Sequence, residues 1–274
     1  MLVAAAVCPC PPLLVPDVAA GAADELDSLR AACADAVGVL AASRPERLVV
    51  VGPAEGPARG VFAPGAAGSF RPFGVPLDVT LGEAAQPPPE ALTPAYPAAA
   101  GSEHTRPPGG GARPGNATPP ADVPPTDDVR PLPPSLAVAA WLLRGWSEVP
   151  VEGLGVGERL EPERCARTGR ALAGSAGRVA LLVMGDGSAC RTVKAPGYLD
   201  ERAVPFDAVV AEALAGADTR ALAALDPELA ETLKVAGRAP WQVLAGAAEG
   251  AGLGGELLCE TSPYGVGYFV ATWT

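Results

Sequence analysis

Residues that could do chemistry follow three apolar stretches of the sequence. Cys10 follows "MLVAAAVC", Glu55 follows "RLVVVGP", and Asp186, Ser188 and Cys190 follow "RVALLVM". Thiols and carboxylates serve as nucleophiles, metal ligands and general acids or bases. Ligands of open α/β sheets bind outside the carboxyl ends of the strands. We therefore expect these strand ends to frame one cleft.

The segment "MGDGSACRT" (184–192) has two interpretations. Asp186 and Ser188 could orient a substrate or a water molecule. They could instead satisfy free backbone N–H groups where the loop leaves its strand, and Gly185 and Gly187 permit the required turn. We favour the structural role. The segment "GPAEGPARG" lacks the Lys and Ser/Thr of a phosphate loop, so no nucleotide site is expected there.

The cysteines also have two interpretations. Cys8 and Cys10 form a C-x-C pair, and thiolates with carboxylates can hold zinc. A thiol with a lowered pKa can be a nucleophile, and Arg191 and Lys194 are the cations nearest to Cys190 in the sequence. Free cysteines, however, usually lie buried as small apolar residues, which is the interpretation we favour for Cys10 and Cys190.

Apolar strands alternate with helices along most of the chain. The pattern predicts strands at 1–8, 47–53, 149–157 and 178–185, helices at 19–43, 135–146, 161–174, around 206–214, around 218–236 and at 239–248, and two C-terminal strands joined by a Ser-Pro turn. Continuous apolar strands between helices require a sheet that is covered on both faces. The expected fold is three-layer α/β/α with a central, mostly parallel sheet and an antiparallel edge.

Composition predicts one domain over residues 1–274, interrupted by a disordered, Pro/Gly-rich insertion at 85–130. The net charge of −11 argues against a nucleic-acid partner and against binding to anionic membranes. No apolar stretch approaches a membrane span, and prolines interrupt the apolar N-terminus too early for a signal peptide. We expect a cytoplasmic protein whose six cysteines stay reduced.

Several blocks of the sequence resemble one family in order and spacing: "AVCPCPPLLVP", "RLVVVGP", "LPPSLAVAAWLL", "MGDGSACRTVKAPGYLDERAVPFDAVVAEAL", "LDPELAETLKVAGRAPWQVLAGA" and "SPYGVGYFVA". The chain resembles the class III extradiol ring-cleavage dioxygenases, in particular their catalytic B subunit and the related Memo-type proteins (the LigB/Memo-type family). The resemblance implies a LigB-like fold, Fe(II) as the family's metal, and assembly of B-type subunits with one another or with a small companion subunit.

The functional residues of that family do not carry over. Its pattern has iron-binding histidines after the first and second strands, an Asp-His pair before a helix, a catalytic histidine after Gly-Asp-Leu-Ser, and a carboxylate ligand farther on. The matching positions here hold Cys10, Ala54, Pro133 with Pro134, Ala189 and Val235. The resemblance therefore implies the fold of the family without its iron ligands or its catalytic base.

The histidine count leads to the same expectation without the alignment. Extradiol cleavage requires Fe(II) held by two His and one carboxylate, and a base with a pKa near neutrality. The one histidine of the chain, His104, falls inside the predicted insertion. We therefore expect no cofactor and no ring cleavage, and we expect a pseudoenzyme that binds a small aromatic ligand or a protein partner.

Two enzymatic alternatives stay open. One is a re-made thiol or metal site in the ancestral cleft, built on Cys10 and Cys190 with carboxylates such as Glu55 and Asp186. The other is residual dioxygenase activity that uses histidines from a partner chain. Tyr264 and Tyr268 could line the cleft, although we expect them to pack.

Overall fold

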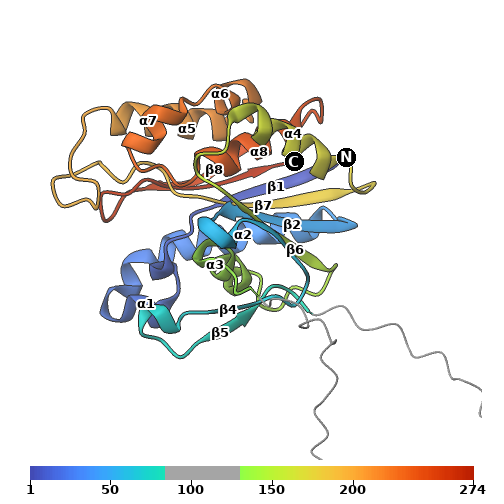
Figure 1. The fold of residues 1–274 in the computed structure, drawn as a ribbon, viewed down its shortest axis with the longest axis horizontal. Helices are drawn as coiled ribbons and strands as arrows, with labels where there is room; N and C mark the ends of the chain where they lie inside the picture. Colours follow the sequence, from blue (N-terminus) through green and yellow to red (C-terminus); the bar gives the residue numbers. More distant parts are fainter. Residues whose placement is uncertain (84–129) are drawn as a thin grey trace, which may run out of the picture. The chain divides into compact units, whose positions relative to one another are not determined.

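The described part of the chain is built around a seven-stranded sheet with the order β3-β6-β2-β7-β1-β9-β8 (Figure 1). The computed structural model describes residues 1–83 and 130–274. The strands of this sheet are β1 (Leu2–Cys8), β2 (Arg47–Pro53), β3 (Gly60–Phe62), β6 (Val151–Val156), β7 (Val179–Met184), β8 (Gly255–Thr261) and β9 (Tyr268–Trp273). The central four strands are parallel, and β3, β8 and β9 are antiparallel to their neighbours.

Helices cover both faces of the sheet, as Figure 1 shows. One layer contains α1 (Pro16–Ala19), α2 (Asp27–Ala42) and α3 (Pro134–Leu142). The other contains α4 (Pro162–Ala173), α5 (Ala203–Ala215), α6 (Thr219–Ala223), α7 (Pro227–Thr232) and α8 (Arg238–Ala248). The predicted three-layer α/β/α fold with a mostly parallel sheet and an antiparallel C-terminal edge is confirmed.

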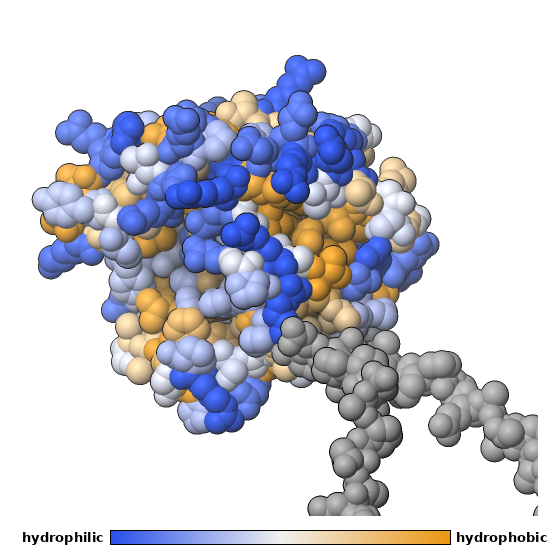
Figure 2. All heavy atoms as spheres, in the orientation of Figure 1, coloured by the Kyte–Doolittle hydropathy of each residue, from blue (hydrophilic) through white to orange (hydrophobic). Residues whose placement is uncertain are grey.

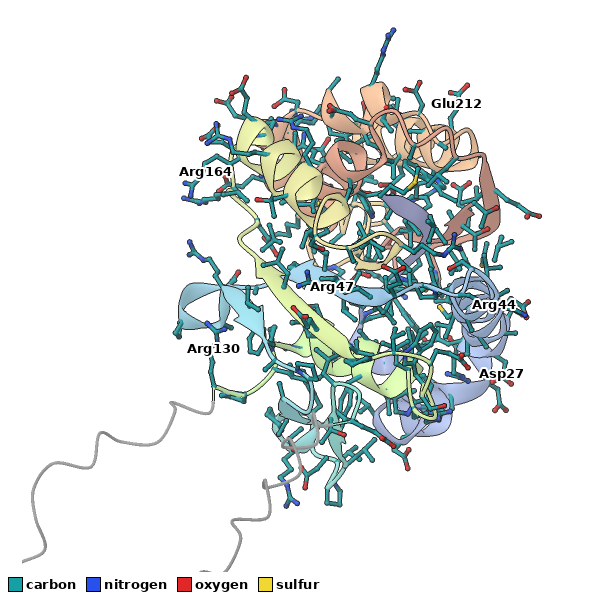
Figure 3. The ribbon with its side chains drawn as sticks, turned by 90° about the vertical axis from the view of Figure 1, so that its right-hand side faces the viewer. Asp27, Arg44, Arg47, Arg130, Arg164 and Glu212 are labelled. Atoms are coloured by element: carbon teal, nitrogen blue, oxygen red, sulfur yellow. The ribbon has the colours of Figure 1, made fainter. Side chains whose placement is uncertain are left out.

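Side chains of the central strands alternate between two hydrophobic cores. In β2, Leu48 and Val50 face the α2–α3 layer, whereas Val49 and Val51 face the α4–α8 layer. All four are at most 2% exposed. Burial of such a side chain contributes roughly 1.5–3 kcal/mol, so a strand apolar on both faces is stable only between two layers. At the strand's start, Arg47 lies over the sheet and pairs with a β6 carboxylate (Figure 3).

Two helix boundaries differ from the predicted ones. Residues 20–26 form a 3-10 helix, so the α-helix predicted from residue 19 begins at Asp27. Most side chains of this first turn are small or exposed and bury little against the sheet. The helix predicted for 135–146 ends at Leu142, because the chain then turns through Gly145, whose φ is 86°.

Three short strands between residues 60 and 80 were not predicted. They are β3 at the sheet edge and the hairpin formed by β4 (Ala67–Ser69) and β5 (Asp78–Thr80). Each has three residues, which is too short for an alternating pattern to show in the sequence. The hairpin lies beyond α3, on the side of that helix away from the sheet (Figure 1).

The predicted insertion at 85–130 lies outside the described residues, except for its last residue. The Arg130 guanidinium donates hydrogen bonds to the carbonyl oxygens of Pro57, Arg59 and Val61 (Figure 3 shows its position). Arg130, at the end of the predicted insertion, is therefore tied to the folded unit. Within residues 1–83 and 130–274, no helix combines the length and apolar character needed to span a membrane.

Hydrophilic side chains cover much of the face shown in Figure 2. Hydrophobic residues are exposed on the same face in a hollow to the right of centre.

Candidate functional site

The carboxyl ends of β1, β7 and β2 lie side by side, because these three parallel strands are neighbours in the sheet. Cys8 is paired with Met184, and the N–H of Gly185 donates to the Cys8 carbonyl at 3.0 Å. The loops that carry Cys10 and Asp186 therefore leave the sheet together. Their proximity agrees with the expectation that the carboxyl ends of neighbouring parallel strands lie together.

Asp186 and Cys10 are in direct contact at this edge. The backbone N–H of Cys10 donates to Asp186 Oδ1 at 2.8 Å. Burial raises the pKa of Asp186 to about 7, although its hydrogen bonds with Cys10 oppose the shift. Burial, followed by the Asp186 charge, raises the pKa of the Cys10 thiol well above its ordinary value. Near neutral pH the pair thus offers a carboxyl group in both protonation states beside a neutral thiol.

A tyrosine and a second carboxylate complete this neighbourhood. Burial raises the pKa of Tyr268, and the charges of Asp186 and Cys10 raise it further. Tyr268 is 3% exposed, so the prediction that it packs is confirmed, yet it packs beside the site. Burial and then Glu55 raise the pKa of Glu158, whose negative charge also acts on Cys10. Glu158 was not predicted as a site residue, although it follows the predicted 149–157 strand and so lies at a strand end as well.

Glu55 lies on the rim of a cavity of about 470 Å³ beyond the ends of β2 and β6. Acidic and basic side chains share the lining: Glu55, Glu158, Glu161, Arg59, Arg159 and Arg164. Glu55 itself is exposed and precedes a short 3-10 helix. It therefore belongs to the edge of the site, whereas Asp186 and Cys10 belong to its interior.

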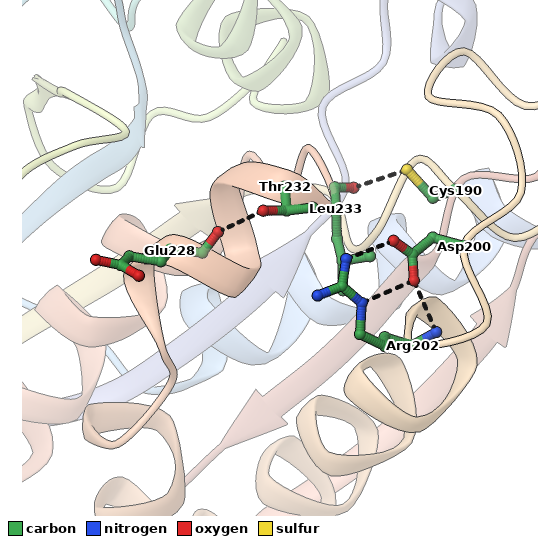
Figure 4. Close-up of polar contacts among 6 residues, drawn as sticks. All are labelled: Cys190, Asp200, Arg202, Glu228, Thr232 and Leu233. Atoms are coloured by element: carbon green, nitrogen blue, oxygen red, sulfur yellow. Dashed lines mark hydrogen bonds and ion pairs between the residues drawn. The ribbon is translucent and has the colours of Figure 1, made fainter.

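Cys190 does not join this group. Its thiol points at the carbonyl oxygen of Leu233, 3.5 Å away (Figure 4), and it is 1% exposed. It belongs to the core on the α4–α8 side of the sheet, whereas Cys10 belongs to the core on the α2–α3 side. Burial raises the pKa of Cys190, and the charged groups that act on it, Asp200, Lys234 and Asp207, do not act on Cys10. Burial as a small side chain, the favoured interpretation, is confirmed for both cysteines.

Ser188 has a structural role, but not as the cap that was expected. Its hydroxyl and its backbone N–H both donate to the Asp207 carboxylate of α5, at 2.7 and 2.8 Å. The side chain therefore supplies a hydrogen to a buried carboxylate and does not accept one from a free N–H group. Asp186 does accept from a backbone N–H, as expected, and the donor is Cys10 in the loop after β1.

The remaining positions from the resemblance carry no ligand atoms in their side chains. Ala54, Ala189 and Val235 are 4%, 9% and 4% exposed, Pro134 begins α3, and Pro133 precedes it. The described residues contain no histidine, because His104 lies outside them. No three His, Cys, Asp or Glu side chains in 1–83 and 130–274 are grouped so as to hold a metal ion. The donor set at these strand ends does not fit the two-His, one-carboxylate site of extradiol iron.

All six cysteines are free thiols. Cys8 lies in the same core as Cys33 of α2, and its contact with the Cys33 thiol raises the pKa of Cys33. Cys8 therefore belongs to the interior of the sheet, in the same hydrophobic core as Cys10 and Cys33.

No family model matches the chain, and no curated protein matches it. Among solved structures, the chain is similar to an uncharacterized protein of Escherichia coli K12, with 14% sequence identity, a TM-score of 0.48 and 99% of each chain covered. At this level of similarity, no property of that protein is transferred to this one.

Proposed function

We propose that the protein binds a small, hydroxyl-bearing aromatic molecule at the Asp186–Cys10 edge and does not cleave it. The observation that carries the proposal is the 2.8 Å contact between the Cys10 N–H and a carboxyl group whose pKa is raised to about 7. The backbone N–H and the thiol of Cys10 both contact this carboxyl group, which keeps further acceptor positions for a ligand.

The chemistry of the neighbourhood suits a neutral polar ligand. A carboxyl group that titrates near neutrality both donates and accepts hydrogen bonds, as a phenolic hydroxyl does. The Cys10 thiol and the Tyr268 hydroxyl stay protonated, because burial and nearby negative charges raise the pKa of each. The resemblance to extradiol dioxygenases makes a catechol the first ligand to test.

Iron chemistry is not part of this proposal. The positions that the resemblance assigns to iron ligands hold Cys10, Ala54 and Val235, whose side chains cannot form the family's facial triad. The thiol-based alternative is also less well supported. A nucleophilic cysteine requires a lowered pKa, whereas burial and Asp186 raise that of Cys10.

The decisive experiment separates binding from turnover. Calorimetry of the full chain with catechol should show saturable binding, and addition of Fe(II) and oxygen should give neither oxygen uptake nor a ring-opened product. In Asp186→Asn the affinity for catechol should lose its dependence on pH between 6 and 8. Glu212→Gln, an exposed α5 change, is the matched control (Figure 3). Stoichiometric oxygen uptake with catechol would refute the proposal, as would unchanged binding in the Asn variant.

Thiol labelling tests the alternative site. Both Cys10 and Cys190 should react slowly with a maleimide in the native protein and rapidly after denaturation. Rapid native labelling of Cys10 at pH 7 would instead favour the re-made thiol site. The cytoplasmic location, a protein partner and homo-oligomers stay predictions from the cysteines, the composition and the resemblance.

A further inference from the structure

A second cavity, of about 600 Å³, lies between the end of α3, the β4–β5 hairpin and α1. It shares no lining residue with the cavity beside Glu55. Two tryptophans line it, Trp141 from the last turn of α3 and Trp146 from the loop that follows. The indole N–H of Trp146 donates to the Val149 carbonyl at 3.0 Å, which holds that ring in place.

The guanidinium group of Arg144 lies over the face of the Trp141 ring. The guanidinium carbon of Arg144 lies 4.0 Å from the ring centroid, within the range of a cation–π interaction. Arg144 is exposed and has no ion pair with a carboxylate in the described residues. An exposed, flexible side chain without an ion pair is free to leave the ring when another cation competes for it.

The charges around the cavity favour a cation as well. Asp17, Asp78 and Glu83 line it against the single cation Arg144. Asp78 is neutralised by Arg71, whose hydrogen bonds lower the pKa of Asp78 to about 2, while Asp17 and Glu83 have no such partner among the described salt bridges. The carbonyl end of α3 faces the same region and adds partial negative charge.

We propose that this cavity binds a small organic cation with an alkylated ammonium group, which replaces Arg144 on the Trp141 ring. Aromatic faces recognise quaternary ammonium groups because such ions are large, weakly hydrated and unable to donate hydrogen bonds. The mixture of indole rings and carboxylates supplies the apolar walls and the counter-charge that such a ligand requires. This site is independent of the function proposed for the Asp186–Cys10 edge.

Choline and its uncharged isostere 3,3-dimethylbutan-1-ol provide the test on the full chain. Tryptophan fluorescence is a suitable signal, because two of the four tryptophans, Trp241 and Trp273, are fully buried away from the cavity. Choline should quench the emission saturably at constant ionic strength, and the isostere should not. An equal response to both compounds, or no response to choline, would refute the proposal.

Variants locate the response. Trp141→Leu should weaken choline binding by about tenfold, and Trp141→Phe, which keeps an aromatic face, by about threefold. Arg144→Gln should tighten binding by about threefold, because it removes the competing cation. Asp17→Asn should weaken it by about twofold, and Glu212→Gln, outside the cavity, should leave it unchanged. Weaker choline binding in Arg144→Gln would overturn the assignment. Unchanged choline affinity in both Trp141→Phe and Trp141→Leu, if both variants fold, would overturn it as well.

Discussion

Asp186 lies in the loop after β7, and Asp207 of α5 contacts that loop, but the two carboxyl groups have different partners. Asp207 is fully buried, accepts both hydrogens of Ser188, and lies 3.5 Å from the Arg191 guanidinium. Asp186 is only partly buried, accepts the backbone N–H of Cys10, and has no ion-pair partner among the described residues. Burial raises the pKa of both, but only Asp207 receives opposing help from a cation.

The difference indicates a structural role for the Asp207 carboxylate, whereas the Asp186 carboxyl group can still bind a ligand. Asp207 accepts two hydrogen bonds that attach the loop to α5, and its carboxylate is fully buried, so a ligand cannot reach it. Asp186 keeps unused acceptor capacity at a strand edge where ligands of this fold class bind. Polar groups that the protein leaves incompletely paired near a cleft are better functional candidates than fully paired ones.

Removal of the structural carboxylate should have the largest effect. Asp207→Ala leaves the Ser188 N–H and hydroxyl without acceptors and the Arg191 charge without its partner, so we expect a loss of about 3–5 kcal/mol in the free energy of unfolding. Urea denaturation measures it. Asp207→Asn keeps an acceptor for Ser188 and should lose clearly less. Equal losses in the two variants would show that the charge, not the hydrogen bonds, dominates.

Replacement of the available carboxyl group should stabilise the protein, in a pH-dependent way. The pKa of Asp186 is raised from 3.8 to about 7 in the folded state. The folded state therefore holds the proton more tightly, and stability falls as pH rises from about 4 to 7. Asp186→Asn removes this cost, which is at most about 4 kcal/mol above pH 7, and should change little at pH 4.

Urea denaturation of wild type and Asp186→Asn at pH 4.5, 6 and 8 gives the measurement. The difference between the two proteins should grow with pH over this range. Asp207 also has a raised pKa, so the comparison is made between proteins that both retain it. A difference that stays constant with pH would mean that Asp186 is ionised throughout and that the contrast with Asp207 is wrong.

The fold could be predicted from the sequence because strands β2 and β7 contain continuous apolar runs. Leu48 to Val51 and Val179 to Met184 are buried on both faces, and such runs require helices on both sides. The three-residue strands β3, β4 and β5 could not be predicted, because their pairing depends on neighbours that are distant in sequence. Local pattern carries no information about such contacts.

The site was predictable to the level of strand ends but not of side-chain direction. Cys10, Asp186 and Cys190 all follow strands, yet Cys190 turns into the opposite core. Asp186 and Cys190 of one short loop therefore contact different faces of the sheet. The alternation of side chains along a strand does not predict the direction of side chains in the loop that follows. Two further residues, Glu158 and Asp207, lie in other segments of the chain, and Asp207 is the hydrogen-bond partner of Ser188. No local sequence motif therefore predicts that they lie near the loop.

Tight packing around the structural carboxylate predicts a third effect. A Cβ atom at Gly187 would lie 2.7 Å from the Phe269 ring and 2.9 Å from Asp207 Oδ1. Gly187→Ala should therefore lose about 1–3 kcal/mol of unfolding free energy. Gly38→Ala in α2 is the matched control, because nothing lies within 4 Å of the new Cβ there, and it should gain up to about 1 kcal/mol. A neutral Gly187→Ala would mean that the loop moves away from Asp207 without cost.

The smallest expected effect on stability comes from replacing Arg191, the cation that pairs with Asp207 but not with Asp186. Arg191 lies at 3.5 Å from Asp207 and 4.0 Å from Glu260, and its side chain is 19% exposed. The pair is therefore partly screened, and Arg191→Gln should cost only about 1 kcal/mol at neutral pH. A double-mutant cycle with Asp207→Asn isolates the interaction. A coupling near zero would make the Ser188 hydrogen bonds alone responsible for holding the loop. A coupling above about 3 kcal/mol would instead make Asp207 a buried ion whose charge depends on Arg191, and the contrast with Asp186 would then lie in the cation alone.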